Sequence, residues 1–265
     1  MLTHILAVMA AALYLIAAGL LARPLLHRRA LPKVLTFGLA SVAVFLHVAL
    51  LVGMHRGGVD LHFFAALSLV GGCIAALCLL VNLARPVATL GVIVFPLAAA
   101  LLLVDVFLAP TTQPMAIEWQ IKLHVVFAML GYSVLSVAAL LAILLAIQEH
   151  ALRRHDFSGF SAALPPLTLT EGLMFQLIGA GFVLLTLTLL SGILFVANLF
   201  EQHLIHKTVL SIAAWFVFGA LLFGRWRYGW RGRRAVRLTL SGMALLLLAF
   251  FGSRFVLELV LKRVP

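Results

Sequence analysis

Long hydrophobic runs follow one another along this chain, with little polar sequence between them. The runs long enough to cross a bilayer occupy residues 3–22, 34–54, 62–83, 88–109, 119–149, 171–200, 206–224 and 237–261. A membrane-spanning helix needs about 20 such residues. The apolar positions are continuous rather than alternating, which predicts helices and not the strands of a barrel. We therefore expect an all-α fold: a polytopic membrane helical bundle of about eight transmembrane helices, forming a single domain over residues 1–265.

The composition agrees with this prediction. Hydrophobic residues make up 65% of the 265 positions and charged residues only 10%, which leaves too little polar surface for a soluble domain of this size. The first run has no Lys or Arg before it, unlike a signal peptide, so we expect it to be a span of the mature protein.

Basic residues alternate between the loops and predict the orientation. They gather at residues 23–33, at Arg85, at Arg153 and Arg154, and at residues 225–237. The positive-inside rule places these loops in the cytoplasm and both termini outside. The net charge of +11 is then explained by topology and by anionic lipid. Nucleic-acid binding is disfavoured because the last basic cluster is short and lies against the bilayer.

Histidine is the residue type that the membrane setting makes informative. Of the ten histidines, most fall on the predicted outer side. His47 would lie roughly 10 Å and His124 roughly 7 Å below that surface, and His206 opens the seventh run. Imidazole binds iron, copper or zinc, and buried ionisable groups in spans are usually functional. The alternative is a core histidine that hydrogen-bonds a backbone carbonyl or a Ser or Thr side chain.

Other motifs narrow the chemistry. Arg254 lies four residues before Glu258 and shares its helical face. The two residues either neutralise each other, or Arg254 meets an anionic ligand group at the outer leaflet. The chain has no HExxH, CxxCH, Gly-x-Ser-x-Gly or nucleotide-binding loop, so the sequence does not indicate a zinc hydrolase, covalent haem attachment or an ATPase. We expect a binding protein and not an enzyme.

Four stretches of the chain resemble the cytochrome c assembly protein family. They are residues 124–148, 206–215, 229–235 and 251–255. The resemblance covers nearly the whole chain and is closest to the short eight-span, YpjD-like branch. It implies a multi-pass protein of the bacterial inner (plasma) membrane that binds haem b non-covalently through histidines and presents it at the outer face.

The resemblance also implies residue roles. His124 is similar to the family's first outer ligand, and His47 to a ligand embedded in an early span. His206 is the other partner open to His124, and Arg254 would neutralise a haem propionate. The chain departs from the larger members of the family before residue 206, where it has no tryptophan-rich loop, and near the ends of its last two runs, where it has no histidine.

The expected function is therefore a haem-binding membrane protein that assists cytochrome c maturation or haem trafficking. Its expected partners are the lipid bilayer and other cytochrome c maturation proteins. The departures favour an alternative, a non-catalytic accessory or regulatory subunit of another membrane protein with a degenerate haem site. A secondary transporter is less favoured, because it needs a polar site at the midplane and the deep charges here lie toward the outer leaflet.

Overall fold

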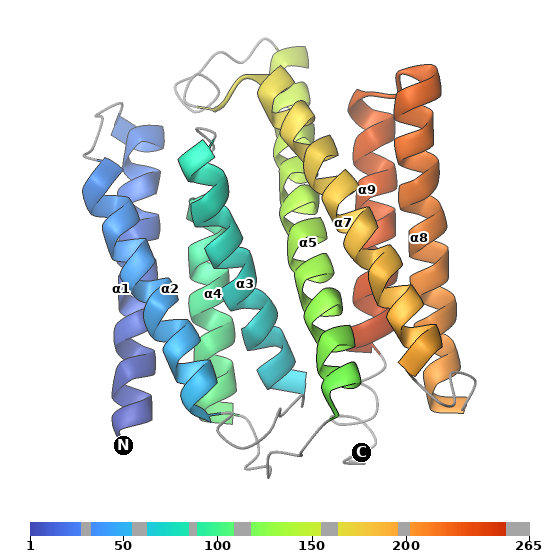
Figure 1. The fold of residues 1–265 in the computed structure, drawn as a ribbon. Helices are drawn as coiled ribbons and strands as arrows, with labels where there is room; N and C mark the ends of the chain where they lie inside the picture. The colour runs from blue at the N-terminus through green and yellow to red at the C-terminus, as the bar shows by residue number, and fades with distance from the viewer. Residues whose placement is uncertain are drawn as a thin grey trace. The chain divides into compact units, whose positions relative to one another are not determined.

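The chain is helical throughout the part that the structure, a computed structural model, describes: residues 1–27, 33–54, 63–84, 89–108, 118–154, 164–195 and 202–252. In chain order (Figure 1) the elements are α1 (Leu2–His27), α2 (Lys33–Met54), α3 (Phe63–Ala84), α4 (Thr89–Leu108), α5 (Trp119–Arg153), α7 (Leu167–Phe195), α8 (Gln202–Tyr228), α9 (Gly232–Leu247) and the π-helix η1 (Leu248–Gly252). Within these ranges, seven α-helices are long and apolar enough to cross a membrane. The all-α polytopic fold is confirmed, whereas the outward placement of both termini stays a prediction.

Two of the predicted runs begin later along the chain than the helices to which they correspond. The predicted run 171–200 corresponds to α7, which already begins at Leu167, directly after Pro165 and Pro166; proline's fixed φ suits a helix start. The predicted run 237–261 corresponds, up to residue 252, to α9 and η1, and α9 begins five residues earlier at Gly232; residues 253–261 lie outside the described residues. Arginine is a good helix former and its long stem can reach the membrane surface, so the helix extends through the basic segment that hydropathy excluded.

The chain divides into two compact units. The first comprises Met1–Ala116 and Gln148–Leu167, and the second comprises Ile117–Ile147 and Thr168–Pro265. The first unit contains α1 to α4, and the second contains most of α5 together with α7, α8, α9 and η1. The single domain expected over residues 1–265 stays a prediction.

Small residues pack the first unit. In it α1 lies against α2 and α4, and α3 also lies against α2 and α4. Ala7, Ala10 and Ala17 of α1 are fully buried, and small side chains let helix backbones approach closely. Ala7 and Ala10 form one core cluster with Leu50 and Leu102.

Glycines pack the second unit in the same way. A Cβ atom on Gly181 of α7 would lie 2.5 Å from the Leu135 side chain of α5, and one on Gly242 of α9 would lie 2.8 Å from Phe218 of α8. These contacts require glycine, because the facing side chain already fills the space. They hold α7 against α5 and α9 against α8.

Two polar bonds, one partly buried and one buried, also join helices of the second unit. The Trp215 indole N–H donates to the Thr186 hydroxyl at 2.9 Å, linking α8 to α7. The Tyr132 hydroxyl donates to the carbonyl of Leu246 at 2.9 Å, two residues before η1 begins. Tyr132 thereby ties α5 to the place where α9 changes to a π-helix.

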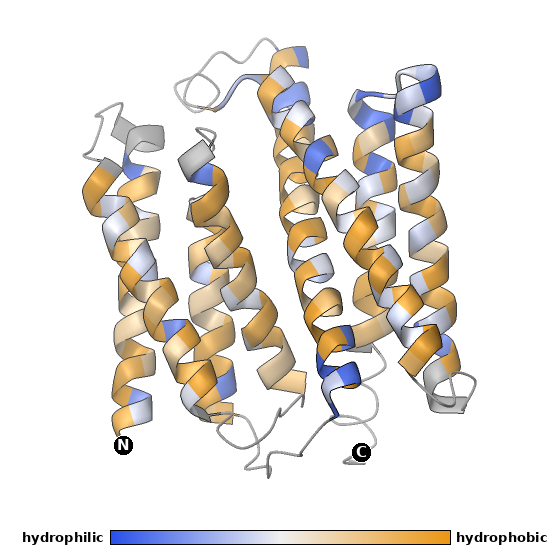
Figure 2. Ribbon diagram, in the orientation of Figure 1, coloured by the Kyte–Doolittle hydropathy of each residue, from blue (hydrophilic) through white to orange (hydrophobic). Residues whose placement is uncertain are grey.

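The surface of each unit suits lipid. Figure 2 shows apolar residues along the middle of the helices and polar residues toward their ends. Large side chains such as Phe45, which is 71% exposed, and Phe216, which is 62% exposed, point away from the protein core. In a bilayer these side chains would contact acyl chains, so their exposure to lipid carries no penalty.

Candidate functional site

His124 is held by α7 through one of its two ring nitrogens. Its Nδ1 atom lies 3.0 Å from the hydroxyl oxygen of Ser191. The Ser191 hydroxyl in turn donates its hydrogen to the carbonyl of Thr188 at 3.0 Å. A hydroxyl has a single hydrogen, so the Ser191 oxygen can only accept from His124. With the Ser191 hydrogen on Thr188, the arrangement fits the His124 tautomer that is protonated on Nδ1, which leaves a lone pair on Nε2.

The remaining nitrogen of His124 is available for a ligand. The described residues give Nε2 no hydrogen bond, and the side chain is half-buried. A Cβ atom on Gly192 would lie 3.3 Å from Cε1 of the ring, so the glycine lets the imidazole rest against α7. The ring is thus fixed in both tautomer and orientation.

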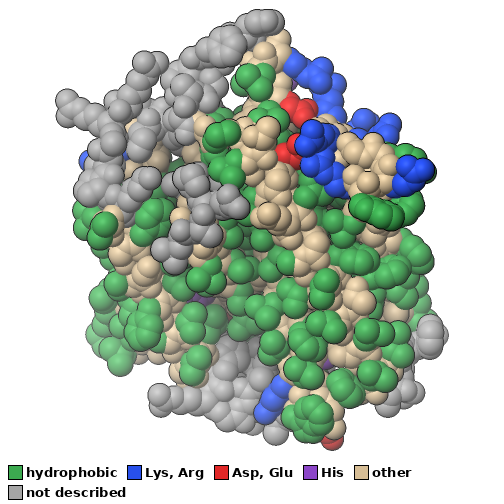
Figure 3. Space-filling model, turned by 45° about the horizontal axis from the view of Figure 1, so that its top comes forward, with side chains coloured by type: hydrophobic (Ala, Val, Ile, Leu, Met, Phe, Trp, Pro, Cys, Tyr) green, Lys and Arg blue, Asp and Glu red, His purple; other side chains and the backbone are tan. Residues whose placement is uncertain are grey.

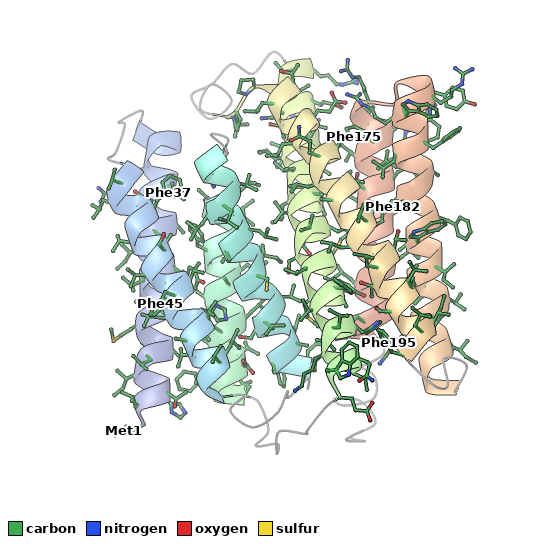
Figure 4. All side chains as sticks on the ribbon, in the orientation of Figure 1. Met1, Phe37, Phe45, Phe175, Phe182 and Phe195 are labelled. Carbon is green, nitrogen blue, oxygen red and sulfur yellow. The ribbon has the colours of Figure 1, made fainter. Side chains whose placement is uncertain are left out.

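His124 and Ser191 lie near one end of the second unit. α5 begins at Trp119 and α7 ends at Phe195, and the rings of these two residues meet with centroids 6.1 Å apart. Figure 4 shows Phe195 at this end of α7. His124 and Ser191 each lie one to two turns from this end, roughly 6–8 Å along their helices. The depth of His124 below the membrane surface stays a prediction.

His47 has a different environment, inside the first unit. Its side chain is fully buried. Nδ1 lies 3.3 Å from the Tyr14 hydroxyl, and Nε2 lies 3.1 Å from the Ser68 hydroxyl. Both ring nitrogens are therefore engaged, as in the alternative of a core histidine bonded to a hydroxyl. Binding of a metal by His47 stays a prediction, and it would require one of these bonds to be replaced.

The other two predicted site residues are His206 and Arg254. His206 is exposed on the first turns of α8. Because α8 begins shortly after α7 ends, His206 lies at the same end of the second unit as Ser191. Arg254 and its predicted partner Glu258 fall outside the described residues. His47 belongs to the first unit and His124 to the second.

Sequence reasoning missed an ion-pair cluster at the other end of the second unit. Glu171 of α7 is 6% exposed. Its two carboxylate oxygens lie 3.6 Å from Arg225 and 3.6 Å from Arg231. The signal was an acidic residue at the start of an apolar run, which a membrane protein must compensate. Sequence reasoning also did not single out Ser191, whose hydroxyl contacts His124.

Comparison with known proteins gives one family. Residues 31–261 match the family model described as "Cytochrome C assembly protein". The chain is 43% identical over 137 residues to the inner membrane protein YpjD of Escherichia coli strain K12, covering 52% of each chain. It is 34% identical over 155 residues to an uncharacterized 28.8 kDa protein of Azospirillum brasilense, covering 58% of this chain and 57% of that one.

A more distant relative carries a functional name. The chain is 26% identical over 164 residues to the cytochrome c biogenesis protein CcsA of Guillardia theta, covering 56% of this chain and 54% of the relative. The chain thus matches about half the length of these curated relatives. No solved structure matches the chain.

Proposed function

This chain belongs to the cytochrome c assembly protein family, and from that premise we propose that it is a haem-binding membrane protein that assists cytochrome c maturation or haem trafficking. Family membership supports a role in cytochrome c biogenesis. The seven candidate spans and the similarity to an inner membrane protein support a multi-pass location in that membrane. The finer proposal concerns haem, held at the outer face.

The observation that carries the proposal is the state of His124. Haem iron is commonly bound by a neutral imidazole nitrogen. A ligating histidine almost always donates its other N–H to a fixed acceptor, which sets the tautomer. His124 has this arrangement, with Nδ1–H on Ser191 and Nε2 unoccupied by the described residues. The residues present therefore fit one axial ligand of a haem.

The second ligand is best sought at the same end of the second unit. His206 is an exposed imidazole there, and we propose it as the partner of His124. His47 is the less favoured partner, because both of its nitrogens are hydrogen-bonded. In this proposal an apolar porphyrin enters from the outer leaflet of the membrane, and Arg254 neutralises a propionate.

The test is the absorption spectrum of the full chain, purified in detergent from haem-replete cells. A Soret band is expected. It should disappear in His124→Ala and weaken in His206→Ala. His150→Ala is the matched control, because His150 is an exposed histidine in the last turn of α5. A colourless wild-type protein that also binds no added haem would overturn the proposal.

The engaged ring of His47 also favours a second candidate, an accessory or regulatory subunit of another membrane protein with a degenerate haem site. Under this hypothesis His47 is a structural residue, and His124→Ala, His206→Ala and His150→Ala all leave the function unchanged. Stable co-purification with another membrane protein, unchanged in His124→Ala, would favour this candidate over haem binding.

A further inference from the structure

We propose that the turn between α8 and α9 binds the phosphate headgroup of an anionic phospholipid. Six arginines lie on or beside this turn, which we call the arginine turn (residues 225–237): Arg225, Arg227, Arg231, Arg233, Arg234 and Arg237. Figure 3 shows basic side chains gathered beside acidic atoms at this end of the second unit. The inference is independent of haem and lies at the opposite end of α7 from His124.

Two of the arginines have a structural role. Arg225 contacts Glu171 at 3.6 Å, donates to the carbonyl of Trp230 at 3.4 Å and lies 4.6 Å over the ring of Phe175. Arg231 contacts the other oxygen of Glu171 at 3.6 Å. These contacts fix the turn to α7, and a single carboxylate balances only one of the two charges.

The other four arginines make no salt bridge within the described residues, and two of them lie over aromatic rings: Arg227 is 5.8 Å from the ring centroid of Tyr228, and Arg234 is 5.1 Å from that of Trp230. All four, Arg227, Arg233, Arg234 and Arg237, are exposed. The first turn of α9 contains no acidic residue, and its N-cap makes no side-chain capping bond. Arginines at a helix N-terminus add to the positive end of the helix dipole, whereas an anion there is favoured.

The backbone of the arginine turn is fixed in place. Gly229 has φ 63° and Gly232 has φ 56°, a left-handed conformation that glycine adopts without steric cost. The N–H of Gly229 donates to the carbonyl of Arg225 at 3.1 Å. The indole of Trp230 packs directly on the Gly224 backbone. A ligand that binds here meets ordered backbone, so little entropy is lost in arranging the site.

The depth of the arginine turn in the membrane indicates that the bound anion is a lipid headgroup. The apolar span of α8, Ile205–Tyr228, ends within the arginine turn. Trp226 is 81% exposed and Tyr228 is 66% exposed, and such aromatic residues lie at the headgroup level of a bilayer. The exposed arginines are therefore placed where phospholipid phosphates lie, and anionic headgroups attract such side chains.

The experiment titrates the full chain in detergent with phosphatidylglycerol or phosphatidylcholine and counts bound lipids by native mass spectrometry. The variant R233Q/R234Q removes two of the arginines that make no salt bridge within the described residues. The control R153Q/R154Q removes two exposed arginines at the end of α5. One basic side chain at an anionic surface changes affinity by about fivefold. We expect phosphatidylglycerol to bind preferentially, R233Q/R234Q to weaken it about 25-fold, and the control to bind as the wild type does.

Three results would overturn the proposal: equal binding of the two lipids, equal loss of binding in both double variants, or displacement of the lipid by inorganic phosphate at equal concentration. The last result would indicate a site for free phosphate. If circular dichroism shows that R233Q/R234Q is unfolded, Arg237→Gln decides, with an expected loss of about fivefold. An unchanged affinity in a folded Arg237→Gln would then count against the site.

Discussion

The Nδ1 atom of His124 lies 3.0 Å from the Ser191 hydroxyl oxygen, and that contact decides which nitrogen of the ring can bind a metal. When the Ser191 hydroxyl donates to the Thr188 carbonyl at 3.0 Å, its oxygen accepts from the N–H of His124. Ser191 is thus a positioning residue for His124 under the proposed function.

Ser191→Ala is expected to weaken haem binding without abolishing it. Loss of a hydrogen-bond partner behind a metal-binding histidine typically costs about 10- to 100-fold in affinity. Ser191→Thr, which keeps a hydroxyl, should restore most of the affinity. The measurement is a haem titration of the apoprotein followed at the Soret band.

The matched control for this substitution is Ser133→Ala. Ser133 is also a buried serine that donates to its own helix, to the carbonyl of Met129 at 2.7 Å, but it contacts no histidine in the described part of the chain. Nitrogen-15 spectra of the apoprotein provide a second readout, since they report the His124 tautomer whether or not haem binds. A His124 proton found on Nε2 in the wild type would disprove the role of Ser191 and remove the observation that carries the haem proposal, which would then depend on the Soret band alone.

A second prediction concerns the first unit, where Tyr14→Phe removes the hydroxyl that lies 3.3 Å from Nδ1 of buried His47. The substitution leaves a buried nitrogen without its partner, which costs about 1–3 kcal/mol. We expect a value near the lower limit, because the bond is long. The measurement is the free energy of unfolding in detergent, with Tyr228→Phe, at an exposed tyrosine, as the control. Equal stability of Tyr14→Phe and wild type would show that the contact adds nothing.

The helices could be predicted from the sequence because lipid imposes a strong constraint. A backbone in hydrocarbon must satisfy its own hydrogen bonds, so each apolar run of sufficient length becomes a helix, and the starts of α2, α3 and α4 agree with prediction to within one residue. The start of α9 could not be predicted this way, because hydropathy counts Arg233 and Arg234 as breaks although arginine is compatible with helix.

The site could be predicted only in part. The start of α5 at Trp119 agrees with the prediction, and the position of His124 five residues further on follows from counting along one helix. Its partner Ser191 is 67 positions away, and the partners of His47 lie on two other helices. Which hydroxyl meets which imidazole depends on how the helices are rotated about their axes, and apolar runs without a polar face do not specify that rotation.

A third prediction concerns the Glu171 cluster. Glu171→Gln removes the carboxylate shared by Arg225, whose side chain is 28% exposed, and Arg231, whose side chain is 68% exposed. Breaking a fully buried pair costs about 3–5 kcal/mol, and an exposed pair contributes about 0–1 kcal/mol. We expect an intermediate loss of about 1–2 kcal/mol in the free energy of unfolding.

Two comparisons sharpen this expectation. Arg231→Gln should cost less than Arg225→Gln, since Arg231 is the more exposed partner. Glu149→Gln is the control, because Glu149 has no ion pair in the described residues. If Glu171→Gln and Glu149→Gln unfold at the same denaturant concentration, the cluster does not stabilise the turn.

A fourth prediction contrasts two glycines. A Cβ atom on Gly224 would overlap the indole of Trp230, whereas one on Gly179 of α7 would meet nothing within 4 Å. Gly224→Ala must therefore displace the indole from α8, and overpacking of this kind costs about 1–3 kcal/mol. Gly179→Ala should instead stabilise α7 by about 0.5–1 kcal/mol, because alanine restricts the unfolded chain.

The two glycine variants are compared by thermal unfolding of the full chain in one detergent, with the fluorescence of Trp230 as a local probe. Trp230→Phe identifies its share of the signal and, as a smaller ring, should partly relieve the clash in the double variant Gly224→Ala/Trp230→Phe. A lower midpoint for Gly224→Ala that this double variant partly restores would assign the loss to the Trp230 contact. Equal midpoints for Gly224→Ala and Gly179→Ala would contradict the packing of the indole on α8, and with it the fixed geometry of the arginine turn.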